Sequence, residues 1–364
     1  MDPSGMIDPE IRELLSVRKG KEAYSDASEA STLRMSLNEN MLVDRSFSST
    51  MLIEAARAVD PRAYPRPKGA LALKAIAEKY DIWEDQIAVG NGSDELLELI
   101  MKVFVGRGEA LTVEPTFEMY SFYVGLMRGK ASPVYLRGDF SLDADAVLSR
   151  VGDDTKAIII CSPNNPTGRQ FAKDEVLKIV KEADRLVVVD EAYADFAPYS
   201  LVDEAVKYQN LLVLRTFSKA YGLAGLRIGY CVGDHELIEW IRAAQSPFSV
   251  NAIAQEQVRA VLSNKEIYDI FVRKVVEERG YLMAEFEMIN GVQPFHSDAN
   301  FILFRILDAK KNSSDVARTL RDKGIEIRDR GGLPMLENCL RVTVSTRENN
   351  QKFVRALREI VEGD

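Results

Sequence analysis

The sequence predicts an α/β fold in which a mostly parallel seven-stranded sheet has helices on both faces and is followed by a smaller α+β domain. From residue 86 to residue 232, short and continuously apolar runs alternate with helical stretches. Such runs without polar alternation are typical of strands that are covered on both faces. After residue 234 the pattern changes to long helical periodicity, and the length of 364 residues favours two domains over one.

The predicted large sheet is built from strands and helices that alternate along the chain. Strands are expected at 86–89, 110–113, 133–136, 157–161, 186–189, 211–214 and 227–232. Helices are expected between them, among others at 94–105, 143–150 and 173–183. This alternation is the pattern of a sheet that is wrapped by helices.

The C-terminal part predicts a second, smaller domain. Helices are expected at 236–243, 252–289 and 349–361, and strands at 301–304, 325–328 and 340–344. We therefore expect a large domain of residues 41–245 and a small domain of residues 246–364. Residues 1–40 have no sheet partner of their own in this scheme, and we expect them to pack on one of the two domains.

Composition and charge exclude several classes of function. The 47 basic and 56 acidic side chains give a net charge of −9, which disfavours nucleic acid as a partner. No apolar run approaches the ~20 residues of a membrane-spanning helix, and residues 1–10 do not resemble a signal peptide. The three scattered cysteines suit a reducing compartment. We expect a cytoplasmic protein that binds neither nucleic acid nor membrane.

Histidine and cysteine usage predicts no metal site. The histidines are His235 and His296, and the three cysteines show no CxxC or HExxH spacing. Neither histidine lies near a G-x-S-x-G turn, so a Ser-His-Asp mechanism is disfavoured as well.

Polar side chains follow three neighbouring strands of the predicted sheet. Lys219 comes directly after an apolar strand, in the segment TFSKAYGLAGLR, and Arg227 follows eight residues later. Asn165 lies in SPNNPTG after one strand, and Asp190 begins DEAY after the next. Because ligands bind at the carboxyl edge of such sheets, we expect these side chains to share one crevice.

Pyridoxal 5'-phosphate catalysis needs residues of these types. The amine of Lys219 can form a Schiff base with the cofactor aldehyde, and Asp190 can keep the pyridine nitrogen protonated, so that the ring accepts electrons. Asn165 and Tyr193 can hydrogen-bond to the 3-oxygen of the ring. These roles make Lys219, Asp190 and Tyr193 the predicted catalytic residues.

A cradle for the cofactor phosphate is expected in GNGSDE, between the strand at 86–89 and the helix at 94–105. Free backbone N–H groups and the helix dipole favour a dianion at such a helix start. The predicted cradle comprises Gly92, Ser93, Asp94, Thr216, Ser218 and Arg227.

Together, the motifs GNGSDE, SPNNPTG, VVDEAY, RTFSKAYGLAGLRIG and CLRVTV resemble the fold-type I pyridoxal-phosphate aminotransferases, specifically the histidinol-phosphate aminotransferase branch. The resemblance runs from about Leu37 to the C-terminus. It implies the roles above for the cofactor residues, and it implies that Phe117 stacks on the cofactor ring, where many relatives carry tyrosine. It also implies a homodimer with shared active sites, because Tyr64 matches a family tyrosine that reaches the partner's phosphate group.

The resemblance extends to substrate recognition. Arg328 and Arg341 match the family's paired arginines of the small domain, and a guanidinium group suits a carboxylate or phosphate. Asn40 lies in SLNEN, which matches the family's L-N-E-N segment. The family's upstream tyrosine that contacts the substrate phosphate has no clear counterpart. The candidate for that contact is Tyr24, and the alternative source of charge is Arg18, Lys19 and Lys21.

The resemblance implies an aminotransferase of histidine or other amino-acid biosynthesis. By a ping-pong mechanism it would exchange an amino group between histidinol phosphate, or an aromatic amino acid, and 2-oxoglutarate. Threonine-phosphate decarboxylases share the fold and cofactor residues and remain an alternative. A transcription regulator with an aminotransferase-like domain would need a DNA-binding module, and the residues before Leu37 contain no basic recognition helix.

Overall fold

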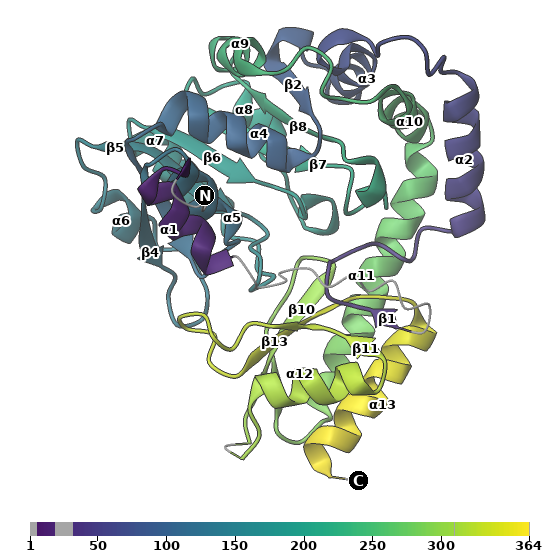
Figure 1. The fold of residues 1–364 in the computed structure, drawn as a ribbon. Coiled ribbons are helices and arrows are strands. Elements are labelled where there is room, and N and C mark those ends of the chain that lie inside the picture. The colour runs from purple at the N-terminus through teal and green to yellow at the C-terminus, as the bar shows by residue number, and fades with distance from the viewer. Residues whose placement is uncertain (1–5, 19–31, 309, 364) are drawn as a thin grey trace.

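The computed structural model describes residues 6–18, 32–308 and 310–363, and a seven-stranded sheet lies within the larger, upper part of the molecule (Figure 1). The strand order is β2-β8-β7-β6-β5-β3-β4. Strand β8 is antiparallel to both of its neighbours, and the other pairings are parallel. The strands are β2 (Ile87–Gly90), β3 (Glu109–Glu114), β4 (Lys130–Tyr135), β5 (Thr155–Cys161), β6 (Leu186–Asp190), β7 (Leu211–Thr216) and β8 (Gly229–Gly233). The predicted mostly parallel sheet is confirmed.

Helices cover both faces of this sheet because its strands are apolar on both sides. In β6, Val187 and Val189 belong to one core, while Val188 between them belongs to the core on the opposite face. One face is covered by α4 (Ser93–Ile100), α5 (Met119–Leu126) and α9 (His235–Ala244). The other is covered by α3 (Ala70–Tyr80), α6 (Ala144–Leu148), α7 (Lys173–Glu182) and α8 (Val202–Ala205). A π-helical turn, Met101–Val105, continues α4 to the end of the helix predicted at 94–105.

The C-terminal part has its own antiparallel sheet, with the order β12-β13-β10-β9 in the described residues. Its strands are β9 (Val292–Pro294), β10 (Phe301–Ile306), β12 (Arg328–Asp329) and β13 (Cys339–Thr343). It packs with the helices α11 (Lys265–Glu287), α12 (Ser313–Asp322) and α13 (Arg347–Glu362). The rings of Phe286, Phe304 and Phe353 contact one another where α11, β10 and α13 meet.

Two predicted elements of this part are divided in the structure. The helix predicted at 252–289 is α10 (Ala252–Ser263) followed by α11, and they meet at Asn264, whose amide donates to the backbone oxygen of Ala260. Asparagine side chains compete in this way for helical backbone groups. The strand predicted at 325–328 is β11 (Ile325–Glu326) and then β12, and only β12 joins the four-stranded sheet among the described residues.

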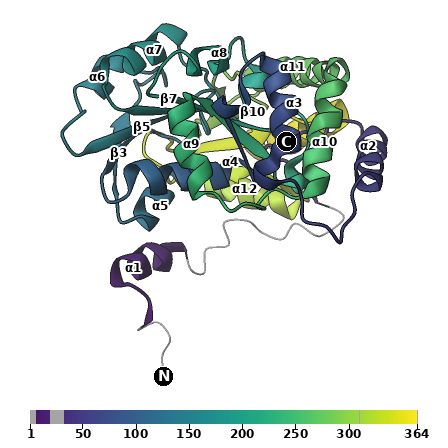
Figure 2. The ribbon, with the colours of Figure 1, turned by 90° about the horizontal axis from the view of Figure 1, so that it is seen from above.

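The N-terminal segment contacts both parts of the molecule. Helix α1 (Pro9–Arg18) lies at the periphery (Figure 2) and packs on α5, where Leu14 covers Gly125. Strand β1 (Leu33–Arg34) pairs in parallel with β11. The expectation that residues 1–40 have no sheet partner was therefore wrong at these two residues, because a two-residue strand is too short for a recognisable pattern.

The two parts are joined by a helix that runs between them. Helix α10 packs on α2 (Arg45–Arg57) and on α3, and α11 continues from there to the smaller sheet (Figure 1). The domain boundary expected between residues 245 and 246 stays a prediction. Short 3-10 turns connect other elements, at Pro67–Gly69, Glu84–Gln86, Ala194–Phe196 and Ala224–Leu226.

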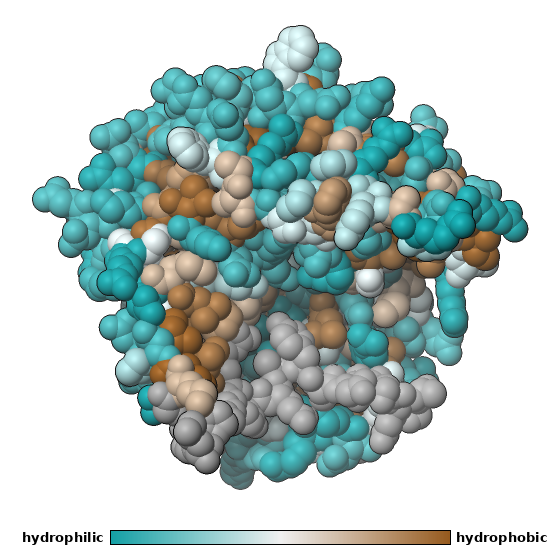
Figure 3. Space-filling model, turned by 45° about the horizontal axis from the view of Figure 1, so that its top comes forward, coloured by the Kyte–Doolittle hydropathy of each residue, from teal (hydrophilic) through white to brown (hydrophobic). Residues whose placement is uncertain are grey.

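On the face that Figure 3 presents, the described residues form a mainly polar surface. Figure 3 shows hydrophobic side chains in separate patches among hydrophilic ones on the face that it presents. Among the helices of the described residues, none combines the length and apolarity that a membrane crossing requires.

Candidate active site

A cavity of about 410 Å³ lies where the carboxyl ends of β5, β6 and β7 face the smaller sheet. The structure brings most of the predicted site residues together around it. Those that line it are Ser93, Asp94, Phe117, Asn165, Asp190, Tyr193, Thr216, Ser218, Lys219, Arg227, Arg328 and Arg341.

Lys219 follows β7 and points its amine into this cavity. Its Nζ donates to the backbone oxygen of Leu37 over 3.0 Å and lies 5.9 Å from the centre of the Tyr193 ring. Burial, together with the positive charge of Arg341, lowers the pKa of Lys219 to about 8. A larger fraction of the amine is therefore unprotonated near neutral pH, as a nucleophile or a general base requires.

Asp190 ends β6 and is buried. Its Oδ2 accepts from the hydroxyl of Tyr120 over 2.8 Å, and its Oδ1 accepts from the N–H of Ala192 over 3.0 Å. Burial raises the pKa of Asp190, while these two hydrogen bonds oppose the shift. A buried carboxylate of this kind is stabilised by a cationic N–H partner. Tyr120 was not predicted, because no motif marks it and its distance to Asp190 depends on how α5 packs on the sheet.

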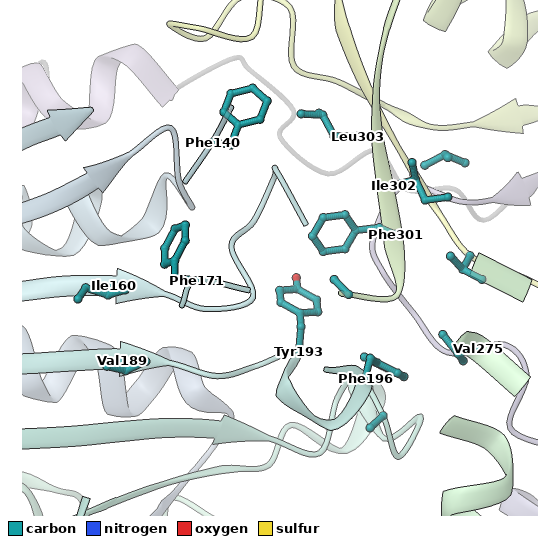
Figure 4. Close-up of a cluster of buried hydrophobic side chains, with 14 of the residues drawn as sticks. Phe140, Ile160, Phe171, Val189, Tyr193, Phe196, Val275, Phe301, Ile302 and Leu303 are labelled. Carbon is teal, nitrogen blue, oxygen red and sulfur yellow. The ribbon is translucent and has the colours of Figure 1, made fainter. Parts of the chain in front are cut away.

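Asn165 and Tyr193 connect the large sheet to other parts of the chain. Asn165 Oδ1 accepts from Nη1 of Arg341 over 2.6 Å, and the Tyr193 hydroxyl accepts from the Asn38 amide over 3.0 Å. The Tyr193 ring packs edge-on against Phe301 of β10, with ring centres 5.0 Å apart (Figure 4). Asn38 was missed, although it lies two residues before the predicted Asn40.

The start of α4 lies beside Arg227, at the place where the anion cradle is expected. Gly92 precedes the helix at φ +85°, a backbone conformation that favours glycine, and a Cβ atom there would also lie 2.8 Å from Nη2 of Arg227. Nη2 of Arg227 lies 3.0 Å from Oδ2 of Asp94. The N–H groups of a first helical turn have no partner within their helix, and an anion beside Arg227 would satisfy them.

At the opposite end of the cavity lies Arg341, which is buried in β13. Its Nη2 donates to the backbone oxygen of Ser36 over 2.5 Å, and its Nε has no hydrogen-bond partner among the described residues. Burial and the charges of Arg330 and Arg328 lower the pKa of Arg341 to about 9. Arg328 lies directly opposite Arg341 in the pairing of β12 with β13. Such a site is completed by an anionic ligand.

Some predicted residues lie elsewhere. The Asn40 amide donates to the backbone oxygen of Ala220 over 2.9 Å, and Asn40 does not line the cavity. Tyr64 is 82% exposed and stacks on Phe248, with ring centres 4.7 Å apart. Outside the described residues lie Lys19, Lys21, Tyr24 and the side chain of Arg18. The substrate role of Asn40 and the cofactor role of Tyr64 stay predictions.

The set of groups along the cavity fits pyridoxal 5'-phosphate. An amine with a lowered pKa stands at Lys219, a buried acid at Asp190, and a helix start with an arginine at Ser93 and Arg227. These are the partners that an aldehyde, a pyridine nitrogen and a phosphate need, respectively. No group of three or more His, Cys, Asp or Glu that could hold a metal ion exists among the described residues.

The family model "aminotransferase class I and II" matches residues 34–357. The histidinol-phosphate aminotransferase of Thermococcus gammatolerans is 38% identical over 91% of this chain and 93% of its own length. The enzyme of the same name from Thermoanaerobacter sp. strain X514 is 33% identical over 98% of this chain and 100% of its own.

Solved structures show the same fold. Histidinol-phosphate aminotransferase from Sinorhizobium meliloti, in complex with pyridoxal 5'-phosphate, matches with a TM-score of 0.84 at 24% identity, covering 98% of both chains. L-threonine-O-3-phosphate decarboxylase from Porphyromonas gingivalis matches with a TM-score of 0.79 at 23% identity, covering 91% of this chain and 99% of its own. The resemblance seen in the motifs is confirmed, and this chain belongs to the class I and II aminotransferases, a family of enzymes that depend on pyridoxal 5'-phosphate.

Proposed function

We propose that this enzyme transfers the amino group of histidinol phosphate to 2-oxoglutarate by a ping-pong mechanism. The observation that carries the proposal is Arg341, a buried guanidinium whose Nε lacks a protein partner among the described residues, at the end of the cavity opposite the α4 cradle. With Arg328 beside it, this end suits an anion, and the donor phosphate and the acceptor carboxylate would use it in turn. The names of the relatives at 33% and 38% identity support this substrate.

The side chains have distinct tasks in this proposal. Pyridoxal phosphate, when bound, supplies an electron-withdrawing ring beside the carbon that carries the substrate amino group. Asp190 holds the proton on the ring nitrogen, and Asn165 and Tyr193 orient the ring through its 3-oxygen. Lys219 would remove the proton from the amino-bearing carbon of the donor. In the second half-reaction it would deliver a proton to the carbonyl carbon of 2-oxoglutarate as that carbon receives the amino group, and its lowered pKa of about 8 suits both transfers. Arg341 and Arg328 fix the far end of the substrate.

A substrate panel tests the proposal. Purified enzyme is offered histidinol phosphate, histidinol, phenylalanine or threonine O-3-phosphate, each with 2-oxoglutarate, and both glutamate and CO₂ are measured. Glutamate formed fastest from histidinol phosphate supports the proposal. A faster reaction with phenylalanine would establish an aromatic aminotransferase instead.

A decarboxylase is the second candidate, because the threonine-phosphate decarboxylase fold matches over 91% of this chain. Release of CO₂ from threonine O-3-phosphate without formation of glutamate would establish it.

We also propose a homodimer with shared active sites, in which Tyr64 of one protomer reaches the cofactor phosphate of the other. The exposed Tyr64–Phe248 pair is a surface that a second copy would cover. Mixing Lys219→Ala subunits with Tyr64→Ala subunits should restore part of the activity, because one site of each hybrid dimer keeps both residues. A monomer in sedimentation experiments would contradict this proposal.

A further inference from the structure

A third arginine and a carboxylate belong to the anionic end of the cavity. Arg330, which follows β12, lines the cavity together with Arg328 and Arg341. Nη1 of Arg330 donates to Oε2 of Glu118 over 3.1 Å, and Nη2 of Arg328 lies 3.7 Å from Oε1 of the same carboxylate. We call Glu118, Arg328, Arg330 and Arg341 the Glu118 cluster.

Glu118 lies beside the cavity and contacts arginines from the other part of the molecule. It comes directly before α5, between Phe117 and Met119, and both of these neighbours line the cavity. Glu118 belongs to the part of the chain that forms the large sheet, and its carboxylate contacts Arg328 of β12 and Arg330, which follows β12. The roles assigned above use Arg328 and Arg341 and leave Glu118 and Arg330 without a task in the reaction.

The Glu118 contact is of a kind that a ligand can displace. The Glu118 side chain is 39% exposed, whereas that of Arg330 is 9% exposed. Ion pairs with an exposed partner contribute at most about 1 kcal/mol, because water solvates the carboxylate almost as well. Arg330 is largely buried and therefore favours an anionic partner, which either Glu118 or a bound ligand can supply. An incoming anion can therefore replace Glu118 at little cost, and Glu118 can turn outward to water.

The charges of the Glu118 cluster set the preferred ligand. Three guanidinium groups and one carboxylate leave an excess of two positive charges within this cluster. The mutual repulsion is visible at Arg341, whose pKa is lowered by burial and by Arg330 and Arg328, and is raised by Glu118. A single carboxylate can be bound by Arg341 alone. A doubly charged group gains further contacts from Arg328 and Arg330, which are the two arginines that Glu118 holds.

We propose that Glu118 is a specificity-determining residue, which acts as an exchangeable counter-ion on Arg330 and Arg328 and must be displaced by the far end of a dianionic substrate. Monoanionic amino acids leave Glu118 in place and gain nothing from these two arginines. This inference rests on the proposed function in that the dianion is the phosphate monoester at the far end of an aminotransferase substrate.

The test compares Glu118→Gln with the unchanged enzyme, in both cases fully loaded with cofactor so that the α4 cradle is filled. Inorganic phosphate serves as the probe, and its binding is measured by titration calorimetry and as inhibition of turnover. Removal of the competing carboxylate should tighten phosphate binding about two- to fivefold, the range that a weak ion pair allows. KM for histidinol phosphate should fall by a similar factor, while KM for phenylalanine should stay unchanged.

Two further variants make the result specific. Glu359→Gln removes the same charge from a surface pair with Lys323 outside the cavity and should not alter phosphate binding. In an Arg330→Met background, Glu118→Gln should have a much smaller effect, because the coupled partner is gone. Unchanged or weaker phosphate binding in Glu118→Gln, an equal effect of Glu359→Gln, or a full effect without Arg330 would each overturn the inference.

The substrate panel tests the proposed substrate, and the phosphate titration tests the role of Glu118, so either proposal can be refuted without the other. If histidinol phosphate is not turned over while Glu118→Gln still tightens phosphate binding, the proposed substrate is wrong and the role of Glu118 stands. If histidinol phosphate is turned over while phosphate binding is unaffected by Glu118→Gln, the role of Glu118 is wrong and the substrate stands. Glutamate, whose carboxylates are singly charged, should keep its KM in Glu118→Gln, and a fall in KM equal to that for histidinol phosphate would overturn the inference.

Discussion

At the cofactor end of the cavity, most side chains stand at or just after the carboxyl end of a strand of the large sheet, whereas at the substrate end the contributing groups come from distant segments. Asp190 ends β6 and Lys219 follows β7. The substrate end combines the backbone oxygen of Ser36 with the side chains of Glu118 and Arg341. The first end is built within one sheet, and the second exists only when the small sheet packs on the large one.

The charges behind the two ends differ as well. Behind the cofactor end, Arg215 of β7 donates to Glu191 over 3.0 Å and to Asp195 over 2.6 Å, and the side chains of Arg215 and Glu191 are almost fully buried. Glu191 directly follows Asp190, and Arg215 directly precedes Thr216, so this network connects the carboxyl ends of β6 and β7. At the substrate end, the half-exposed Glu118 contacts Arg330. In the proposed function, fixed charges would therefore hold the cofactor residues in place, while exchangeable charges would receive the substrate.

Loss of the lysine should have the largest effect. Lys219→Ala should bind no cofactor covalently and should lose more than about 10⁴-fold in kcat, because both the nucleophile and the proton carrier are removed. Absorbance of the loaded protein and an assay with 2-oxoglutarate measure the two effects. Lys207→Ala, at the surface, is the control and should behave as the unchanged enzyme. A normal cofactor spectrum in Lys219→Ala would contradict the assignment.

Disruption of the buried network should come next. Arg215→Met leaves the buried Glu191 and the half-buried Asp195 without their cation, and the free energy of unfolding should fall by about 3–5 kcal/mol. Urea unfolding measures this. Arg259→Met, which breaks an exposed pair with Glu256, and Glu118→Gln should both change stability little. Equal losses in all three variants would remove the distinction between fixed and exchangeable charges.

Neutralisation of the buried acid tests the cofactor end directly. Asp190→Asn keeps the size of the side chain and an oxygen for the Tyr120 hydroxyl, but it cannot hold a proton on a pyridine nitrogen. We expect kcat to fall about 10²–10³-fold, as for other single electrostatic partners in closed sites. The cofactor should stay attached to Lys219, as judged by absorbance. Near-normal turnover would refute the role of Asp190.

A smaller effect is expected at the substrate end. Arg341→Lys keeps the charge but loses the planar fork that donates to Asn165 and Ser36. We expect kcat/KM to fall about 10- to 100-fold in both half-reactions, the size of one lost charge-assisted hydrogen bond. Stopped-flow measurement of each half-reaction tests this. A loss confined to kcat, with KM unchanged, would place Arg341 outside substrate binding.

The smallest effect concerns pH. Because the pKa of Lys219 is lowered to about 8, the amine of the protein without cofactor is protonated below this pH and free above it. The rate at which pyridoxal phosphate attaches should therefore rise about tenfold per pH unit up to pH 8 and level off above it. Absorbance after mixing follows the reaction. A rise that continues to pH 10 would show that Lys219 has the pKa of an exposed lysine.

The same comparison explains what could be predicted from the sequence. Lys219, Asp190 and Asn165 follow strands directly, so a local motif and the geometry of parallel sheets place them together. The contact of Glu118 with Arg330 joins residues more than two hundred positions apart, and it depends on how the small sheet docks. The sequence contains no periodic pattern or motif from which the contact between Glu118 and Arg330 could be predicted.

Local details escaped prediction for a related reason. The hydrogen bond from Tyr120 to Asp190 depends on the packing of α5, and the two-residue strand β1 has no pattern to detect. Asn264 divides one long helical pattern into α10 and α11 although the apolar spacing continues across it. In each case tertiary packing or a single side chain decides the outcome, and periodicity alone carries no signal of it.

Reduction of the loaded enzyme with borohydride, followed by peptide mapping, tests most directly that the cofactor end is centred on Lys219. The reduced cofactor should be found on the peptide that contains TFSKAYG, at Lys219 and nowhere else. The cofactor on any other lysine, or no attachment in a protein that transaminates, would contradict the assignment.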